Sequence, residues 1–294
     1  MFLLISSAGG ARAACGVRSP AMDLRGIVDT RNGESSVALE GALNVRPRSG
    51  LSVGLLGPLS VSVDDRPVSL SAGRLRVLLA ALALSSGQAM SVERLATAVW
   101  ADDRSPGNIR RSVQTYIVRL RRALGAESIG SEPIGYVLRA DPEHVDALRF
   151  VRLLDAASSA SDIADERARL AEALGLWRGR PLEGVPSGWL QESQTPWLVE
   201  RYLAAVERRI DLDVSAGRHR ELVAELSALT ARYPLRESLW ARLLIVLCRS
   251  GRQAEALVRY EKIRARIAAE LGTDPHPVLE RIHADLLARK PPSL

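Results

Sequence analysis

The segment from residue 108 to residue 124 contains five arginines and no acidic residue. The guanidinium group of arginine forms paired hydrogen bonds to guanine edges and to phosphate oxygens, and short amide and hydroxyl side chains reach other base edges. This combination of residue types is typical of a segment that reads DNA. The candidates for DNA binding are Arg110, Arg111, Ser112, Gln114, Thr115, Arg119 and Arg122.

The spacing of the apolar residues predicts that this segment is an amphipathic helix, because side chains on one helical face recur every three or four positions. The apolar stripe consists of Ile109, Val113, Tyr116, Ile117, Leu120 and Leu124. At about 100° per residue, the residues opposite this stripe are Arg111, Thr115, Val118 and Arg122. One face is expected to be buried and the other to meet an anionic partner. The alternative is a basic helix whose charged face only contacts water.

Two helices and a turn are predicted before the basic helix. Residues 73–85 are almost continuously apolar after their arginines, as expected for a helix buried within a small domain. Residues 91–100 begin with a serine that can cap a second helix, and they present apolar side chains to a core. Residues 102–107 indicate a turn that opens the basic helix, and either Ser105 within it or Asn108 after it can cap that helix.

Short strands are predicted on both sides of these helices. Alternating apolar residues across 53–63 indicate a strand that a turn-prone Gly-Pro pair interrupts. Residues 128–129 and 134–138 can pair as a hairpin around residues 130–133. The order of a small sheet, three helices and a hairpin is that of a winged helix-turn-helix, the architecture of response-regulator output domains.

Length and composition fit a globular protein with two domains. The chain has 294 residues, of which 47% are hydrophobic and 25% charged. Its net charge of +6 suits an anionic partner but is modest support alone. The two cysteines are too few for a disulfide framework and suggest a reducing compartment. No apolar run reaches the length that a membrane-spanning helix needs.

Residues 1–50 are rich in Gly, Ser, Arg and Pro and show no sustained periodicity. We expect them to form a disordered, dispensable N-terminal extension. The apolar start, residues 1–5, and the later Cys15 faintly resemble a signal peptide and a lipidation site. The apolar run is too short for a signal peptide, however, and no basic residue precedes it.

From about residue 144 onward the pattern predicts one helix after another. The expected helices are 146–157, 165–177 and 196–217, with a loop at 178–187. Residues 217–221 (GRHRE) then recur as 251–255 (GRQAE), a shift of 34 residues, which is the period of tetratricopeptide helical hairpins. Solenoids of such hairpins bind partner proteins and rarely carry chemistry.

Several segments resemble, in order and spacing, the Streptomyces antibiotic regulatory protein (SARP) family. Residues 55–61 (LLGPLSV) resemble its opening strand, and residues 114–124 (QTYIVRLRRAL) resemble its recognition helix. Residues 135–138 (GYVL) are similar to the return strand of its wing. Further similarities to its bacterial transcriptional activator domain lie at 145–150 (VDALRF), 250–257 (SGRQAEAL) and 270–275 (ELGTDP).

The resemblance implies a mainly α protein. A winged helix-turn-helix with a small β-sheet and wing is expected at residues 51–140, followed by an all-α, tetratricopeptide-like activator domain at residues 141–294. It also implies a cytoplasmic activator that binds direct repeats in double-stranded DNA as a homodimer or tandem dimer. Such an activator recruits RNA polymerase holoenzyme, often at an antibiotic cluster. Two departures are the 50-residue extension and a short wing that carries Glu127 and Glu132.

Two other classes of protein compete with a regulator. An enzyme has little support, because the four histidines are scattered without metal-ligand spacing and Cys248 lies in an apolar run typical of a core. We therefore expect no catalytic residue, metal or cofactor. A pure protein-interaction scaffold built on the helical repeat would explain residues 144–290 but would leave the basic helix unexplained. The alternative to a regulator is therefore a helical-repeat scaffold whose basic helix binds DNA without sequence preference.

Overall fold

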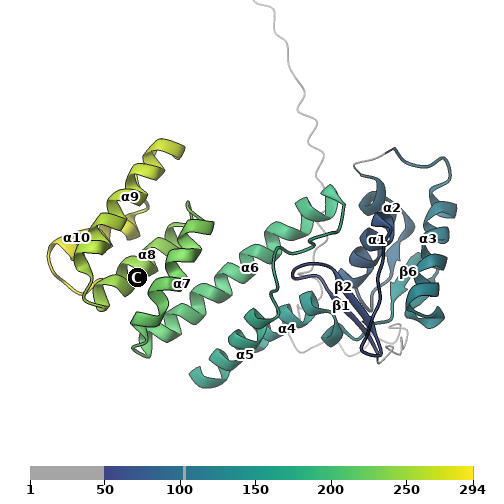
Figure 1. Cartoon of the computed structure of the whole chain (residues 1–294), viewed down its shortest axis with the longest axis horizontal. Helices are drawn as coiled ribbons and strands as arrows, with labels where there is room; N and C mark the ends of the chain where they lie inside the picture. Colours follow the sequence, from purple (N-terminus) through teal and green to yellow (C-terminus); the bar gives the residue numbers. More distant parts are fainter. Residues whose placement is uncertain (1–49, 102–103, 294) are drawn as a thin grey trace, which may run out of the picture. The chain divides into compact units, whose positions relative to one another are not determined.

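The computed structural model describes residues 50–101 and 104–293. The prediction of a disordered extension falls on residues 1–49, which lie outside the described residues, as do residues 102 and 103 of the predicted turn. The described chain begins with strands and continues into helices, as the sequence predicts (Figure 1).

The first sheet is a three-stranded antiparallel meander of strands β1 (Leu51–Gly54), β2 (Ser60–Val63) and β3 (Arg66–Pro67). The single interrupted strand expected at residues 53–63 is therefore two strands that pair with each other, with Val53 opposite Val61. Gly57 lies between them with a φ of 153°, a conformation that side chains with a Cβ rarely adopt. The turn-prone pair reverses the chain rather than merely interrupting a strand.

Three helices follow, and the second and third form the helix-turn-helix. They are α1 (Gly73–Leu84), α2 (Val92–Trp100) and α3 (Ile109–Leu124). Every side chain of α1 from Val77 to Leu84 is buried, which agrees with its continuous apolar pattern. The hydroxyl of Ser91 accepts a hydrogen bond from the backbone N–H of Arg94 at 3.3 Å and so caps α2 as expected.

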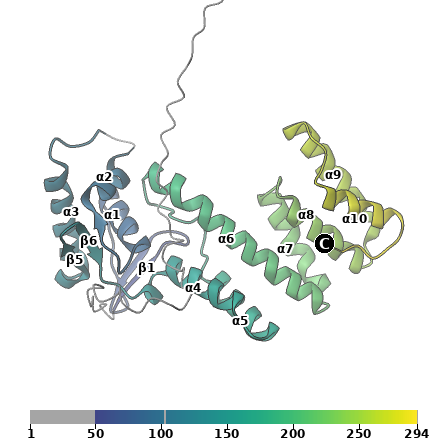
Figure 2. The same ribbon diagram turned by 180° about the vertical axis from the view of Figure 1, so that it is seen from behind.

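The wing is a hairpin of β5 (Ile129–Glu132) and β6 (Gly135–Leu138), preceded by a short 3-10 helix, η2 (Ala126–Ser128). Its turn consists of residues 133 and 134 alone, so the expected turn at 130–133 was placed too early. Gly130 belongs to the strand and pairs with Val137. A two-residue strand, β4 (Met90–Ser91), pairs with β6 and completes the second sheet. Both views show α3 beside this sheet (Figure 1, Figure 2).

The rest of the described chain is helical after the short η3 (Pro142–His144). The helices are α4 (Asp146–Ser158), α5 (Ile163–Gly175), α6 (Gly188–Ser215), α7 (His219–Arg232), α8 (Glu237–Arg249), α9 (Gln253–Leu271) and α10 (Pro277–Leu287). The expected start of the long helix at Pro196 was wrong, because α6 begins at Gly188 and keeps Pro196 inside it. The hydroxyl of Ser187 caps the true start by accepting from the N–H of Leu190 at 3.3 Å.

The 34-residue repeat is visible at the C-terminal ends of α6 and α8, where the same two backbone hydrogen bonds recur. After α6, the N–H groups of Gly217 and Arg218 donate to the carbonyls of Val214 and Asp213. After α8, residues 251 and 252 make the same pair of bonds to residues 248 and 247. The two glycines have φ values of 79° and 77°. Each helix thus ends in a Schellman motif, which requires a left-handed residue at that position.

Replacing Gly251 by alanine should lower the free energy of unfolding by about 1–2 kcal/mol, because a Cβ is disfavoured in the left-handed region. The added Cβ would meet nothing within 4 Å, so the backbone conformation alone carries the cost. Thermal denaturation of the full chain measures it. Gly175→Ala is the matched control, since Gly175 also ends a helix in open space but has no left-handed φ. Equal melting temperatures for both variants would contradict the Schellman assignment.

The helices α4 to α10, called the helical part below, are joined to the first sheet through Asp146 and Arg178. The described residues on both sides of this contact belong to one compact unit of the chain. The carboxylate of Asp146 accepts from the backbone N–H groups of Leu55 at 2.6 Å and Leu56 at 3.1 Å. It also pairs with Nη2 of Arg178 at 3.1 Å. Leu182 donates its N–H to the carbonyl of Leu55 at 2.8 Å. The predicted boundary near residue 140 is therefore crossed by several hydrogen bonds and an ion pair.

Candidate DNA-binding surface

Helix α3 is held by one cap and four buried side chains. The Oδ1 atom of Asn108 accepts from the backbone N–H of Arg111 at 2.9 Å, so Asn108 rather than Ser105 is the capping residue. The buried residues on the inner face are Val113, Ile117, Leu120 and Leu124. Their spacing leaves the opposite face of the helix pointing away from the core of the winged helix.

The predicted DNA-binding residues lie on the outer face or the flanks of α3. Ser112 is half-buried, and the other six are exposed: Arg110, Arg111, Gln114, Thr115, Arg119 and Arg122. At about 100° per residue, Arg111, Thr115, Arg119 and Arg122 fall within one face. Arg110 and Gln114 lie on the flank nearer the wing, and Ser112 lies on the other flank. The hydroxyl of Thr115 donates to the carbonyl of Arg111 at 2.9 Å, which leaves its oxygen as an acceptor.

Among the described residues, the four exposed arginines of α3 form no ion pair, unlike most arginines of the helical part. In the part of the chain that the structure describes, the guanidinium groups of residues 110, 111, 119 and 122 make no hydrogen bond or salt bridge. Arg208, by contrast, forms a bidentate ion pair with Glu166 through hydrogen bonds of 2.6 and 2.8 Å, and this pair lowers the pKa of the Glu166 carboxyl. Unpaired arginines on one helix face keep their charge and donors available for an anion.

The fifth arginine of α3 has a structural role. Nε of Arg121 donates to the carbonyl of Ile129 at 2.9 Å, and Nη2 donates to the hydroxyl of Ser131 at the same distance. Arg121 therefore fixes the wing against α3. Glu127, at the base of the wing, pairs with Arg139 at 3.3 Å. Residues 129–138 contain no Lys or Arg, so the wing supplies no basic side chain at its tip.

Two residues assigned to the buried stripe are not part of the core. Ile109 is 38% exposed, and Tyr116 is half-buried with its ring 6.1 Å from that of Trp100. Ile109 stands in the first turn of α3, beside a groove of about 640 Å³ between α2 and α3. Helical periodicity predicts the direction in which a side chain points. It does not predict whether a neighbouring helix extends far enough to cover that side chain.

Histidine, cysteine and acidic side chains are the residue types that could hold a metal ion or act as a nucleophile. Residues 50–101 and 104–293 contain no group of three or more His, Cys, Asp or Glu side chains placed to hold a metal ion. Burial raises the pKa of the Cys248 thiol, and a protonated thiol is a poor nucleophile. His283 stacks on Tyr260 with ring centroids 3.9 Å apart. No helix in these ranges is both long and apolar enough to cross a bilayer.

Two protein-family models match the chain, one over the winged helix-turn-helix and one over the helical part. The model described as "Transcriptional regulatory protein, C terminal" matches residues 65–138, and "Bacterial transcriptional activator domain" matches residues 145–287. The first match contains all three helices and the wing. The second contains all the helices from α4 to α10.

Curated relatives share both parts. The chain is 40% identical to the regulatory protein AfsR of Streptomyces coelicolor over 82% of its own length, although it spans only 24% of AfsR. It is 34% identical to the regulatory protein DnrI of Streptomyces peucetius, covering 82% of this chain and 93% of DnrI. The match to DnrI therefore includes nearly the whole of that regulator.

A solved structure has the same fold. The chain matches Mycobacterium tuberculosis EmbR, solved in complex with a low-affinity phosphopeptide, with a TM-score of 0.76 and 31% sequence identity. The match covers 82% of this chain and 66% of the EmbR chain. From its two domains, its relatives and its fold, the chain belongs to the SARP family of transcriptional activators.

Proposed function

We propose that the protein binds double-stranded DNA sequence-specifically by inserting α3 into the major groove. The observation that carries this proposal is the set of unpaired arginines on the outer face of α3. Arg111 and Arg122 lie nearest the centre of that face and are assigned to base edges, with Thr115 between them. Arg110, Ser112, Gln114 and Arg119 lie toward its flanks, where phosphates border the groove.

The helical part is proposed to contact RNA polymerase holoenzyme and a second copy of the chain. Exposed apolar side chains on α9 and α10 support a role in protein binding: Val258 is 70% exposed, Leu271 55% and Leu287 63%. Two copies would occupy direct repeats near a promoter, about one helical turn apart. The family suggests that the promoter belongs to an antibiotic or other secondary-metabolite cluster. Such a regulator acts in the bacterial cytoplasm, and no catalytic role is proposed.

Selection of binding sites from a pool of random duplexes tests this function. The full chain should enrich two copies of one short motif in the same orientation. Filter binding should then show that the enriched duplex binds on the order of a thousandfold more tightly than a scrambled duplex at the same salt concentration. Either a pool without an enriched motif or equal affinities for the enriched and scrambled duplexes would support the helical-repeat scaffold instead.

A further inference from the structure

Val118 is an exposed apolar side chain on the outer face of α3. It is 40% exposed, although the residues around it on this face are polar or charged. At about 100° per residue, it lies within one face with Arg111, Thr115 and Arg122. Residues three or four positions apart are neighbours on a helix surface, so Thr115 and Arg122 border Val118 on either side. Val118 therefore meets the same partner as these polar side chains.

The fold does not account for a valine at this position. The buried residues of α3 are Val113, Ile117, Leu120 and Leu124, and Val118 is not among them. In the exposed interior of a helix, valine is less favourable than alanine, arginine or glutamine, because its branched side chain loses rotamer freedom. Its apolar surface also stays in contact with water in the free protein. A partner that covers Val118 explains its use here.

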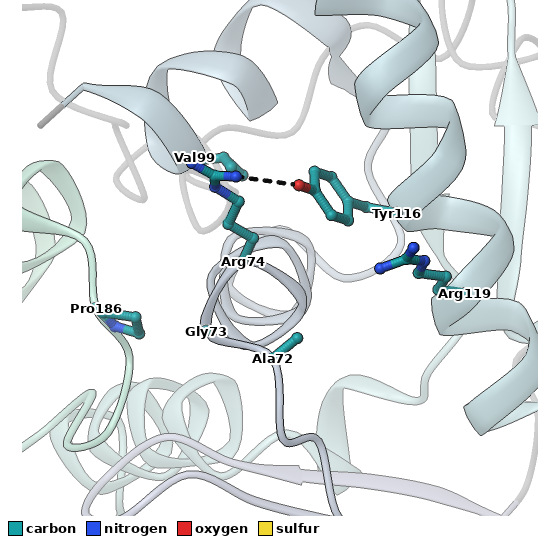
Figure 3. A pocket seen from close by; sticks show the side chains of 7 residues that line it. All are labelled: Ala72, Gly73, Arg74, Val99, Tyr116, Arg119 and Pro186. Atoms are coloured by element: carbon teal, nitrogen blue, oxygen red, sulfur yellow. Dashed lines mark hydrogen bonds between the residues drawn. The ribbon is translucent and has the colours of Figure 1, made fainter. Parts of the chain in front are cut away.

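Both flanks of α3 are fixed, and the face around Val118 lies open between them. On one flank, Tyr116 and Arg119 face the start of α1 across a cavity of about 550 Å³ (Figure 3). The hydroxyl of Tyr116 accepts from Nη1 of Arg74 at 3.4 Å. On the other flank, Arg121 holds the wing through Ile129 and Ser131. Because a valine in a helix strongly prefers one χ1 rotamer, its two methyl groups are presented in one fixed direction.

We infer that Val118 reads a thymine, by packing its methyl groups against the C5-methyl group of that base in the major groove. The inference rests on the proposed function and adds a base type that arginine does not recognise. Arginine forks bond guanine edges, whereas thymine alone among the four bases presents a methyl group in the major groove. Val118 therefore contributes a thymine to a motif in which Arg111 and Arg122 read guanines.

Substitution of uracil for thymine tests this contact, because it removes only the methyl group and keeps the base pair. Each thymine of the enriched duplex is replaced in turn, and filter binding with the full chain measures the affinity at fixed salt. At one thymine of a repeat, the wild-type affinity should fall by about fourfold, the effect of losing one buried methyl group. Val118→Ala should bind the unmodified duplex at least about fourfold more weakly, and uracil at that position should cause no further loss.

Three further measurements separate base reading from other effects. Val118→Ala should keep the wild-type affinity for the scrambled duplex and the wild-type salt slope, because no charge is removed. Its melting temperature should not fall, since alanine favours the helix. Val258→Ala is the matched control, because Val258 is 70% exposed on α9, and it should leave DNA binding unchanged. Thr115→Ser removes the neighbouring methyl group, keeps the hydroxyl, and should retain the effect of uracil.

Several results would overturn the inference while the wild-type chain still selects its motif. One is a motif without thymine, and another is a Val118→Ala variant with wild-type affinity. A third is uracil substitutions that weaken wild type and Val118→Ala equally at every position. If the effect of uracil disappears in Thr115→Ser but persists in Val118→Ala, the methyl group of Thr115 reads the thymine instead. A wild-type chain that selects no motif would overturn the proposed function together with the inference.

Discussion

Arg111→Ala should weaken binding to the enriched duplex by about 1–3 kcal/mol, which corresponds to roughly 5- to 150-fold in affinity. Arg111 lies on the outer face of α3 without an ion pair, so its loss removes a donor pair to DNA and breaks no contact within the protein. Affinity for the scrambled duplex should fall much less, because a base contact contributes only to the cognate site. Equilibrium filter binding at fixed salt measures both affinities.

Arg111→Lys tests the geometry of the proposed contact. Lysine keeps the charge but lacks the planar fork, so it should keep the affinity for the scrambled duplex at the wild-type value and recover only part of the affinity for the enriched duplex. Circular dichroism should show that both variants fold normally, since the side chain is exposed. An unchanged ratio of specific to non-specific affinity in Arg111→Ala would show that Arg111 does not read a base.

Asp146→Ala should lower the free energy of unfolding by about 2–4 kcal/mol, because it removes the acceptor of two buried backbone N–H groups. Its carboxylate accepts from the N–H groups of Leu55 and Leu56, two fully buried residues, and pairs with Arg178. Removing it leaves two buried donors without this acceptor, each costing about 1–3 kcal/mol when no other partner replaces it. Urea denaturation of the full chain measures the change.

Asp155→Ala is a suitable control for this prediction. Asp155 pairs with Arg201 at 2.9 Å, and both side chains are 35% exposed. Solvent-exposed ion pairs contribute about 0–1 kcal/mol. Asp146→Asn, which keeps one oxygen acceptor, should lose less stability than Asp146→Ala. If the two alanine variants were equally stable, Asp146 would not hold the first sheet to the helical part.

The sequence predicted best those elements whose signals are local. Helix α3 and its basic face followed from periodicity and composition, and the Schellman glycines followed from a recurring short motif. The assignment of Ile109 to the core failed because burial at the end of a helix depends on where its neighbours end. The start of α6 was placed at Pro196 because proline often begins a helix, whereas the capping serine nine residues earlier was taken as part of a loop.

Features that depend on tertiary contacts were not predicted. Strand β4 has only two residues and exists because β6 pairs with it, so no local pattern marks it. Arg121 and Arg122 are neighbours in one basic run, yet one fixes the wing and the other faces outward. Asp146 accepts from the backbone of Leu55, 91 residues away in the sequence, and the backbone N–H of Arg178 donates to the carbonyl of Leu56. Such contacts decide which arginines are available to DNA, and only the folded chain reveals them.

The central claim, that α3 lies in the major groove, is tested most directly by site-directed disulfide cross-linking. Thr115→Cys places a thiol on the outer face of α3 in a chain whose own two cysteines are replaced by serine. A duplex carrying the enriched motif, with a thiol tether on one base at a time, should cross-link at one base of each repeat and only from the major groove. Arg220→Cys on α7 should not cross-link. If Thr115→Cys cross-linked no better than Arg220→Cys at every base, α3 would not be the recognition helix.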